Sequence, residues 1–214
     1  MTDVKQSNKK INNNIRKIYK LTPLQEGMLF ECQLNENGQA YVVQKLLRFS
    51  GLLRLDLVQR ALRLLEVQHE VLKTAVLYRK VKKPRQVIVE SRHIGLQIQD
   101  FSNTPQGQRE EYVQRFMKDD LLHGFDLEKE PLLRLTVIKT APNEHYLLWS
   151  FHHIIMDGWC MSIVMGDFLE AYQMLNGGKN YEMLRANYER QARSRLCYSD
   201  YINWLNTRDF SKGL

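Results

Sequence analysis

The stretch Ser150-Phe-His-His-Ile-Ile-Met-Asp-Gly-Trp-Cys160 decides the expected fold. The apolar run that leads into it, His145-Tyr-Leu-Leu-Trp-Ser-Phe151, predicts a β-strand, because turn-forming residues bound it on both sides. Successive side chains of a strand point to opposite faces. We therefore expect His152 to lie with Ser150, and His153 to point the other way. One histidine can then belong to the core while its neighbour faces a cavity.

Two adjacent histidines followed by an Asp-Gly turn fit more than one kind of site. A buried histidine can satisfy both ring nitrogens within the core. His153 and Asp157 are four residues apart and would share a face if helical, which is a spacing that metal ligands use. The segment has strand character, however, and no further cluster of ligand residues lies nearby in the sequence. The pattern favours a base, His153, with supporting residues around it.

These residues also resemble a known family. His152-His-Ile-Ile-Met-Asp-Gly158 matches the HHxxxDG signature of condensation domains of nonribosomal peptide synthetases, a signature shared with chloramphenicol-acetyltransferase-like acyltransferases. Four further stretches resemble the family's motifs in the family's order, from about residue 18 to the end of the chain. They are Leu21-Thr-Pro-Leu-Gln-Glu-Gly-Met-Leu-Phe30, Gln68-His-Glu-Val-Leu-Lys-Thr74, Gly124-Phe-Asp-Leu-Glu-Lys-Glu-Pro-Leu-Leu-Arg134 and Tyr198-Ser-Asp-Tyr-Ile-Asn-Trp204.

The hydrophobic pattern predicts an α/β fold. Apolar periodicity and cap residues predict helices over residues 23–34, 57–68, 103–122, 161–175 and 198–206, with Thr22 capping the first. Strands are expected at residues 40–49, 74–78, 86–90, 96–101, 132–139 and 145–151. Residues 179–196 are charged and poorly periodic, and no element is predicted there. This order favours a largely antiparallel sheet covered by helices. The resemblance implies the N-terminal lobe of a chloramphenicol-acetyltransferase-like fold.

The resemblance also implies a division of the chain. Residues 1–17 are polar and rich in Asn and Lys, and we expect a flexible tail that can dock an upstream synthetase. Residues 18–214 would form the N-terminal lobe of a condensation domain. In the family two similar lobes form a V around a tunnel. Because the last recognisable motif ends at Trp204, we expect the C-terminal lobe to be absent.

Composition excludes several classes of protein. The net charge of +7 comes from basic residues in three stretches, none of which carries interleaved aromatic residues, so nucleic acid is not an expected partner. A basic surface that docks an acidic partner is the alternative. No apolar run approaches the roughly 20 residues of a membrane span, and no signal peptide is recognisable. Three widely spaced cysteines favour reduced thiols and a cytoplasmic location.

The activity that the resemblance implies is peptide bond formation. The amine of an acceptor aminoacyl thioester attacks the carbonyl of a donor aminoacyl or peptidyl thioester. Both substrates are delivered on the phosphopantetheine arms of carrier domains, so no cofactor or metal is expected to bind this chain directly. The expected partners are the donor and acceptor carrier domains, the missing lobe, an adjacent adenylation domain and, through the N-terminus, an upstream synthetase.

The resemblance assigns roles to residues of the signature. His153 is the expected catalytic residue, as a base or as a group that orients the amine, since a histidine titrates near neutral pH. His152 is expected to be structural, and Gly158 to let backbone N–H groups approach the oxyanion. Asp157 should hold the loop by an ion pair with a basic residue. The family's arginine positions are Gln68 and Lys73 here, so that pair would fall to Lys73.

Two motifs indicate a subtype. Residues 22–28, Thr-Pro-Leu-Gln-Glu-Gly-Met, and residues 156–159, Met-Asp-Gly-Trp, resemble the subtype that joins a D-configured donor to an L-configured acceptor. Three alternatives remain open. They are the lobe of an epimerisation domain, a stand-alone acyltransferase that uses coenzyme A, and a non-catalytic lobe that docks carrier or synthetase partners. We expect the isolated lobe to lack turnover.

Overall fold

The computed structural model describes residues 14–34, 39–194 and 198–208, and within them the strands form two sheets. One has the order β2-β7-β6-β5, with strands Val42–Ser50, Glu144–His152, Leu133–Ala141 and Gly95–Asp100. The other has the order β1-β4-β3, with strands Ile15–Lys20, Arg85–Val89 and Thr74–Leu77. Strands β5 and β6 pair in parallel, and all the other strand pairs are antiparallel. The predicted α/β fold with a largely antiparallel sheet is therefore confirmed.

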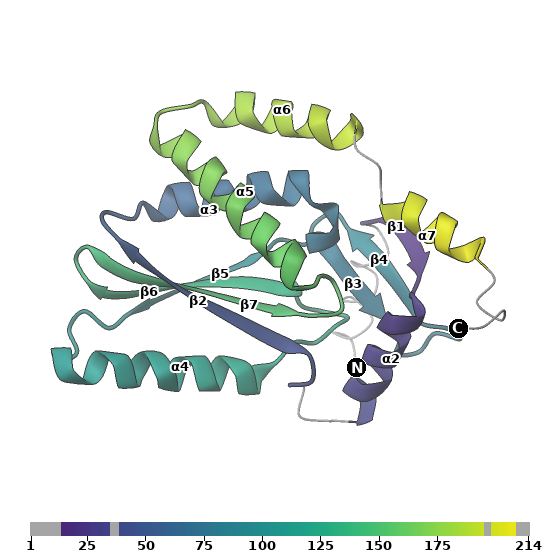
Figure 1. Ribbon diagram of the computed structural model, residues 1–214, viewed down its shortest axis with the longest axis horizontal. Helices are drawn as coiled ribbons and strands as arrows, with labels where there is room; N and C mark the ends of the chain where they lie inside the picture. Colours follow the sequence, from purple (N-terminus) through teal and green to yellow (C-terminus); the bar gives the residue numbers. More distant parts are fainter. Residues whose placement is uncertain (1–13, 35–38, 195–197, 209–214) are drawn as a thin grey trace, which may run out of the picture.

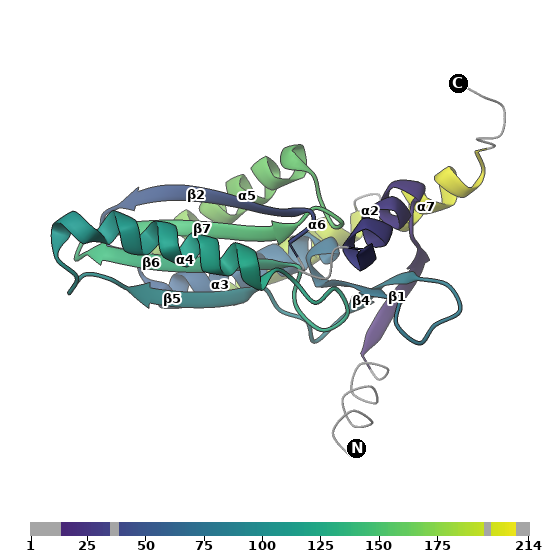
Figure 2. The same ribbon diagram turned by 90° about the horizontal axis from the view of Figure 1, so that it is seen from below.

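Helices cover both faces of the four-stranded sheet (Figure 1). Helix α3 (Leu55–Gln68) and helix α5 (Gly158–Asn176) cross one face, and α4 (Arg109–His123) runs along the other, in front of the strands in Figure 2. Helix α6 (Tyr181–Ser194) packs against α3, and α7 (Tyr198–Asn206) lies beside β1. Helix α2 (Pro23–Leu34) follows β1, and short 3-10 helices precede β3 (η1, Glu70–Lys73) and α4 (η2, Gln106–Gln108).

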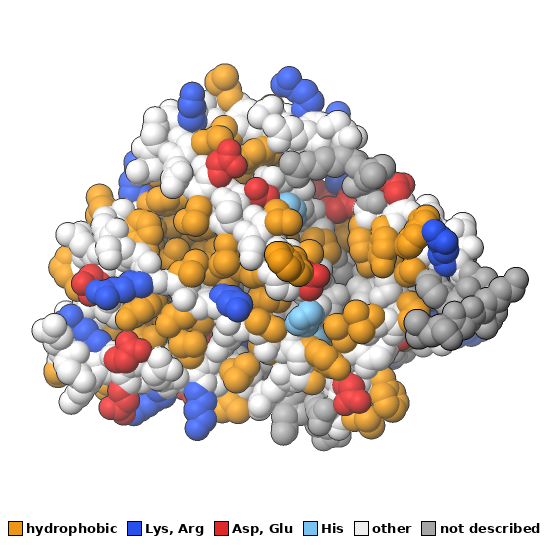
Figure 3. All heavy atoms as spheres, in the orientation of Figure 1, with side chains coloured by type: hydrophobic (Ala, Val, Ile, Leu, Met, Phe, Trp, Pro, Cys, Tyr) orange, Lys and Arg blue, Asp and Glu red, His pale blue; other side chains and the backbone are white. Residues whose placement is uncertain are grey.

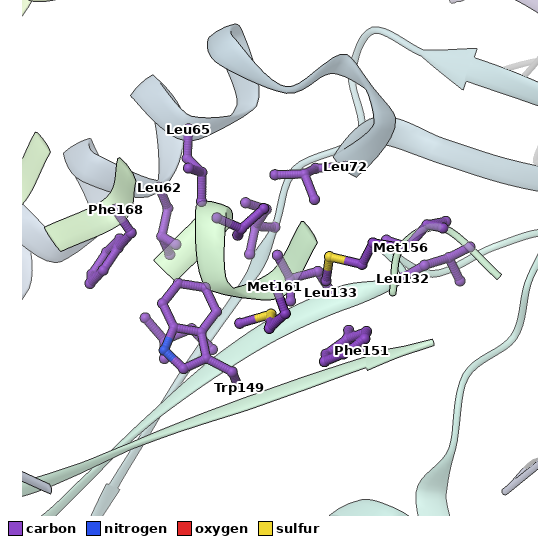
Figure 4. Close-up of a cluster of buried hydrophobic side chains, with 14 of the residues drawn as sticks. Leu62, Leu65, Leu72, Leu132, Leu133, Trp149, Phe151, Met156, Met161 and Phe168 are labelled. Atoms are coloured by element: carbon purple, nitrogen blue, oxygen red, sulfur yellow. The ribbon is translucent and has the colours of Figure 1, made fainter. Parts of the chain in front are cut away.

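The alternation along β7 sorts its side chains between two apolar layers. Leu147, Trp149 and Phe151 pack with α3 and α5 in the main core. The Trp149 ring meets the ring of Phe168 edge-on, with centroids 5.0 Å apart (Figure 4). Leu148 points the other way, into a smaller cluster under α4. Apolar side chains pack against both faces of β7, so a shift in register would expose them. The register of β7 is therefore fixed, and with it the position of His152 at the end of the strand.

Helix α2 begins as predicted. The Oγ1 atom of Thr22 accepts a hydrogen bond from the backbone N–H of Gln25 at 3.2 Å, and Pro23 occupies the first helical position. Helix α4 begins later than predicted, at Arg109, because η2 occupies the residues after Pro105 and the helix has no side-chain cap. At the end of α5 the chain turns through Gly178, whose φ of +83° favours glycine.

Two elements were not predicted. Residues 15–17 were expected in a flexible tail, but they begin β1, which alternates between half-buried and exposed side chains and pairs with β4. That prediction is wrong for residues 15–17. Of the remaining residues of the expected tail, 1–13 lie outside the described residues. Helix α6 occupies the stretch that looked poorly periodic, because only Tyr181, Leu184 and Tyr188 contact the core.

Part of the basic stretch at residues 79–92 is structural. The Arg92 side chain is buried, and its guanidinium donates hydrogen bonds to the backbone carbonyls of Thr74, Glu128 and Glu130. Burial lowers the pKa of Arg92 to about 10. Arg79 forms ion pairs with Asp126 and Glu128. These two arginines therefore hold the segment before β6 in place and do not form part of an unpaired basic surface.

Candidate active site

The HHxxxDG signature begins on the last residue of β7 and ends at the start of α5. His152 pairs with Val42 of β2 in the sheet register. The backbone N–H of His153 donates to the carbonyl of Tyr41 at 2.8 Å, just beyond the ladder. Tyr41 has a φ of +63°, an uncommon conformation for a residue other than glycine. This conformation directs the chain into β2 beside the first residues of the signature.

His152 lies in the interior. Its side chain is buried, its Nδ1 atom accepts a hydrogen bond from the backbone N–H of Ile154 at 3.1 Å, and its Nε2 atom lies 3.4 Å from Cys32 Sγ. An acceptor at Nδ1 places the proton of the neutral ring on Nε2. Burial lowers the pKa of His152 to about 4, against the opposing effect of a hydrogen bond with the carbonyl of Ala40. The ring is therefore neutral at physiological pH.

His153 differs from His152 in its surroundings. Its side chain is half-buried, at the point where the chain leaves β7 for the turn before α5. It lies close enough to Asp157 for the two charges to interact. The alternation of the strand thus separates the two histidines as the sequence predicts, with the first in the core and the second at the surface. The catalytic role of His153 remains a prediction.

Asp157 is the N-cap of α5. Its Oδ1 atom accepts a hydrogen bond from the backbone N–H of Cys160 at 2.8 Å. This hydrogen bond is the main reason why the pKa of the exposed Asp157 carboxyl is lowered, and the nearby N–H of Trp159 and the ring of His153 act in the same direction. Gly158 is the first residue of the helix, so it lies where backbone N–H groups point out of the helix end.

The predicted ion pair between Asp157 and Lys73 is not formed. The Nζ atom of Lys73 lies 3.2 Å from Oε1 of Glu90, which directly follows β4 of the three-stranded sheet. Among the described residues, the salt bridges within 4.0 Å do not include Asp157. The prediction is wrong because the N–H groups at the start of α5 take the role that it gave to a cation. Gln68 donates instead to Asp167 of α5, at 2.9 Å.

A polar network lies behind β7, on its α4 side. The Arg134 Nε atom donates to Asp120 Oδ1 at 2.6 Å, and both side chains are buried. The other carboxylate oxygen of Asp120 accepts from Ser150 Oγ at 2.6 Å and from Gln44 Nε2 at 2.7 Å. Burial alone would raise the pKa of Asp120, but these hydrogen bonds and the charge of Arg134 lower it. The network fixes the last turns of α4 to the strand that carries His152.

A cavity of 1110 Å³ opens on the face shown in Figure 3, but it does not contain the two histidines. The signature contributes Ile155 and Met156 to its wall, beside residues of η1, α5, α6 and α7 that include Cys160 of α5. In the described part of the chain, no group of three or more His, Cys, Asp or Glu side chains lies close enough to hold a metal ion. The helices described there also include none with the length and hydropathy needed to cross a bilayer.

Several residues around the histidines were not predicted. Tyr41, Cys32 and Gln25 meet the signature from segments more than a hundred residues earlier in the chain. Gln25 lies within a stretch that resembles a family motif, which marked the region but not the contact. Tyr41 and Cys32 carry no sequence signal, because their roles arise only from the pairing of β2 with β7 and from the position of α2.

Comparison with known proteins agrees with this geometry. The condensation domain family matches residues 15–213. The chain belongs to the condensation domain family. Over 203 residues it is 38% identical to a component of the linear gramicidin synthase of Brevibacillus parabrevis. Over 195 residues it is 35% identical to a component of the plipastatin synthase of Bacillus subtilis (strain 168). These matches cover 95% and 91% of the chain, but only 4% and 7% of the two synthase polypeptides.

Solved structures share the fold. The starter condensation domain of rhizomide synthetase RzmA superposes with a TM-score of 0.71 at 18% identity, over 82% of this chain and 46% of that one. The first condensation domain of the calcium-dependent antibiotic synthetase superposes with a TM-score of 0.70 at 23% identity, over 78% of this chain and 40% of that one. The chain therefore has the fold of less than half of each of these domains.

Proposed function

We propose that the chain is the N-terminal lobe of a condensation domain that forms a peptide bond between two carrier-bound aminoacyl thioesters, with His153 at the catalytic position. The observation that carries the proposal is the contrast between the two histidines. His152 is buried and neutral, whereas His153 is half-buried at a strand end whose backbone is held by Tyr41. A ring that can reach a substrate, on a backbone that is fixed, suits a positioned base.

The chemistry requires the loss of one proton. The acceptor amine attacks the donor carbonyl, a C–N bond forms, and the C–S bond of the donor thioester breaks. A free α-amine has a pKa of about 7.7–8.0, so part of it is neutral and nucleophilic near physiological pH. The nitrogen gains a positive charge as the tetrahedral intermediate forms, and His153 would accept its extra proton or orient the amine. The departing thiolate then takes up a proton.

The start of α5 would help to hold the oxyanion. The carboxylate of Asp157 accepts a hydrogen bond from the N–H of Cys160. Gly158 directly follows this cap, at the positive end of the helix dipole. A carbonyl oxygen placed there would be stabilised as its negative charge develops. We give Gly158 this role, His152 and Asp157 the role of supporting the turn, and Lys73 no role at the reacting atoms.

We also propose the delivery of substrates on phosphopantetheine arms of donor and acceptor carrier domains, because the related synthase polypeptides are far longer than this chain. A D-configured donor, an adjacent adenylation domain and an upstream synthetase that docks the N-terminus belong to the same proposal. The apolar side chains of Trp159 and Ile163 are 85% and 58% exposed, one helical turn apart on α5. They support a second lobe that covers this side of the site.

The test is an assay with two carrier domains that are loaded with a donor and an acceptor amino acid. We expect no dipeptidyl product from the chain alone, and product when the remaining lobe is supplied in the same polypeptide. Product from the chain alone would contradict the proposed need for a second lobe. Conversion of an L-aminoacyl carrier to its D-form would instead identify an epimerisation domain, and carrier binding without product in the complete polypeptide would identify a docking lobe.

A further inference from the structure

We infer that Gln25 is a positioning residue for His153, which it acts on through the carbonyl group of Ile154. The inference rests on the proposed function, because it assumes that the position of the His153 ring matters for catalysis. Gln25 lies 129 positions before Ile154 in the chain, and its side chain is buried. Among the residues that the structure describes, no other side chain donates to the carbonyl of Ile154.

The first step of the argument is that the side chain of Gln25 is itself held firmly. Thr22 and Gln25 form a reciprocal cap at the start of α2. The Gln25 N–H donates to Thr22 Oγ1 at 3.2 Å, and the Thr22 N–H donates to Gln25 Oε1 at 3.0 Å. The end of the side chain is therefore fixed to the first turn of the helix that carries it.

The second step is the orientation of the amide group. Its Nε2 atom donates to the carbonyl of Ile154 at 2.9 Å, while its Oε1 atom accepts from the backbone of Thr22. A carbonyl needs a donor and an N–H needs an acceptor, so only this orientation satisfies both neighbours. Exchange of the nitrogen and oxygen would place two acceptors together at Ile154.

The third step is a second glutamine that completes the set of hydrogen bonds. The Gln86 Nε2 atom lies 3.1 Å from Gln25 Oε1, and Gln25 Nε2 lies 3.3 Å from Gln86 Oε1. Gln86 is also buried, and it donates to the carbonyl of Lys20 at 2.9 Å. Both donors and both acceptor positions of the Gln25 amide are thus engaged. The Tyr198 hydroxyl, whose pKa is raised by burial, also interacts with both amides.

The fourth step connects Gln25 to the catalytic histidine. The N–H of Ile154 is held by His152, its carbonyl is held by Gln25, and the N–H of His153 is held by Tyr41. The backbone at His153 and Ile154 is therefore fixed by groups from two other segments and by the neighbouring His152. Without Gln25 the buried carbonyl of Ile154 would lack a donor, and the turn would have to move to find one. A displacement of about 1 Å at a reacting group can lower a rate about a hundredfold.

Two substitutions separate this role from the stability of α2. Gln25→Leu removes the amide. Gln25→Glu keeps a side chain that can cap the helix, but an ionised carboxylate cannot donate to Ile154. Burial raises the pKa of a carboxyl above its ordinary value of about 4.3, and the protonated form can donate again. Thr22→Ala is the matched control, because it weakens the cap and leaves the amide of Gln25 in place.

The readout is the nitrogen NMR spectrum of the histidine rings of the chain, in which His153 is identified by its absence from the His153→Ala spectrum. We expect the His153 resonances to broaden and shift in Gln25→Leu, and in Gln25→Glu at about pH 8. They should return toward the wild-type spectrum in Gln25→Glu as the pH falls toward 5. The resonances of the exposed His123 serve as the reference at each pH and should be the same in every variant, and circular dichroism confirms that each variant is folded.

The same variants are then placed in the polypeptide that forms the dipeptide. We expect Gln25→Leu to lower kcat by about tenfold to a hundredfold and to leave the affinity for the loaded carriers unchanged. Unchanged His153 resonances in both Gln25 variants would overturn the inference, whatever the rates. An equal spectral change in Thr22→Ala would also overturn it, because helix stability would then be the cause. If His153→Ala keeps full activity, the proposed function fails, and the spectra still decide whether Gln25 positions the ring.

Discussion

The backbone N–H of Ile154 donates to Nδ1 of His152 at 3.1 Å, so the first histidine of the signature holds the residue that follows the second. This bond requires a neutral ring with its proton on Nε2. Protonation of His152 would place a second donor against the N–H of Ile154 and a charge in the interior. Among the residues that the structure describes, no hydrogen bond ties a backbone N–H to the ring of the neighbouring His153, and this difference agrees with the separate roles proposed for the two residues.

The first prediction concerns the pH dependence of stability. The pKa of His152 is lowered to about 4 in the folded chain, whereas an unfolded histidine titrates near 6.5. Between these values the unfolded chain binds a proton that the folded chain does not. Stability should therefore be lost as the pH falls from about 6.5 to about 4, and His152 should contribute about 3 kcal/mol to that loss. Urea unfolding at a series of pH values measures it.

The control for this prediction is His152→Asn. Asparagine keeps an acceptor for the N–H of Ile154 but does not titrate. Burial also lowers the pKa of His145, so some pH dependence should remain in the variant. The difference between wild type and variant isolates His152. If the free energy of unfolding fell equally steeply with pH in the two proteins, His152 would not take up a proton on unfolding.

The second prediction concerns Asp157. Because its carboxylate caps α5, Asp157→Ala should lower the free energy of unfolding by about 1 kcal/mol, whereas Asp157→Asn should have little effect, since asparagine caps helices as well. If Asp157 instead formed an essential ion pair, both substitutions would lower the free energy of unfolding. Thermal or urea unfolding of the two variants distinguishes a cap from an ion pair.

A double-mutant cycle tests the corrected partner of Lys73. Lys73→Met and Asp157→Ala should have additive effects on the free energy of unfolding, to within about 0.5 kcal/mol, because the two side chains do not share a contact. The comparison is a second cycle with Lys73→Met and Glu90→Gln, because Lys73 and Glu90 form an ion pair. A coupling of more than about 1 kcal/mol between Lys73 and Asp157 would restore the ion pair that the sequence suggested.

The third prediction concerns the buried pair behind β7. Asp120→Ala leaves the guanidinium of Arg134 buried without its carboxylate, and it should lower the free energy of unfolding by about 3–5 kcal/mol. Glu111→Ala breaks the exposed ion pair with Arg115 on the same helix, and it should cost about 0.3–0.5 kcal/mol. Urea unfolding compares the two. Equal effects would mean that the buried network contributes no more than a surface pair.

The sequence predicted the elements that bury a regular apolar face. The alternation around His152 and His153, the cap at Thr22 and the periodicity of α3 all depend on nearby residues, and the structure has them where they were expected. Helix α6 was missed because only three of its fourteen residues contact the core, which leaves a weak pattern. Strand β1 was missed because its exposed face is mostly basic, as expected of an edge strand.

The supporting contacts of the site could not be predicted in the same way. The partner of Asp157 was inferred from a resemblance, and the start of α5 supplies a nearer one. The hydrogen bonds from Gln25 to Ile154 and from His153 to Tyr41 join segments more than a hundred residues apart. Such contacts depend on the final arrangement of sheets and helices, which no local pattern encodes.

The measurement that tests the central claim most directly is the rate of dipeptide formation by a synthetase that contains this chain, with His153 intact or replaced by alanine. Both carriers are loaded beforehand, and circular dichroism checks that the variant is folded. We expect His153→Ala to lower the rate by about a hundredfold or more while carrier binding is unchanged. A variant that forms product at the wild-type rate would contradict the account, because the proton would then be removed without this imidazole.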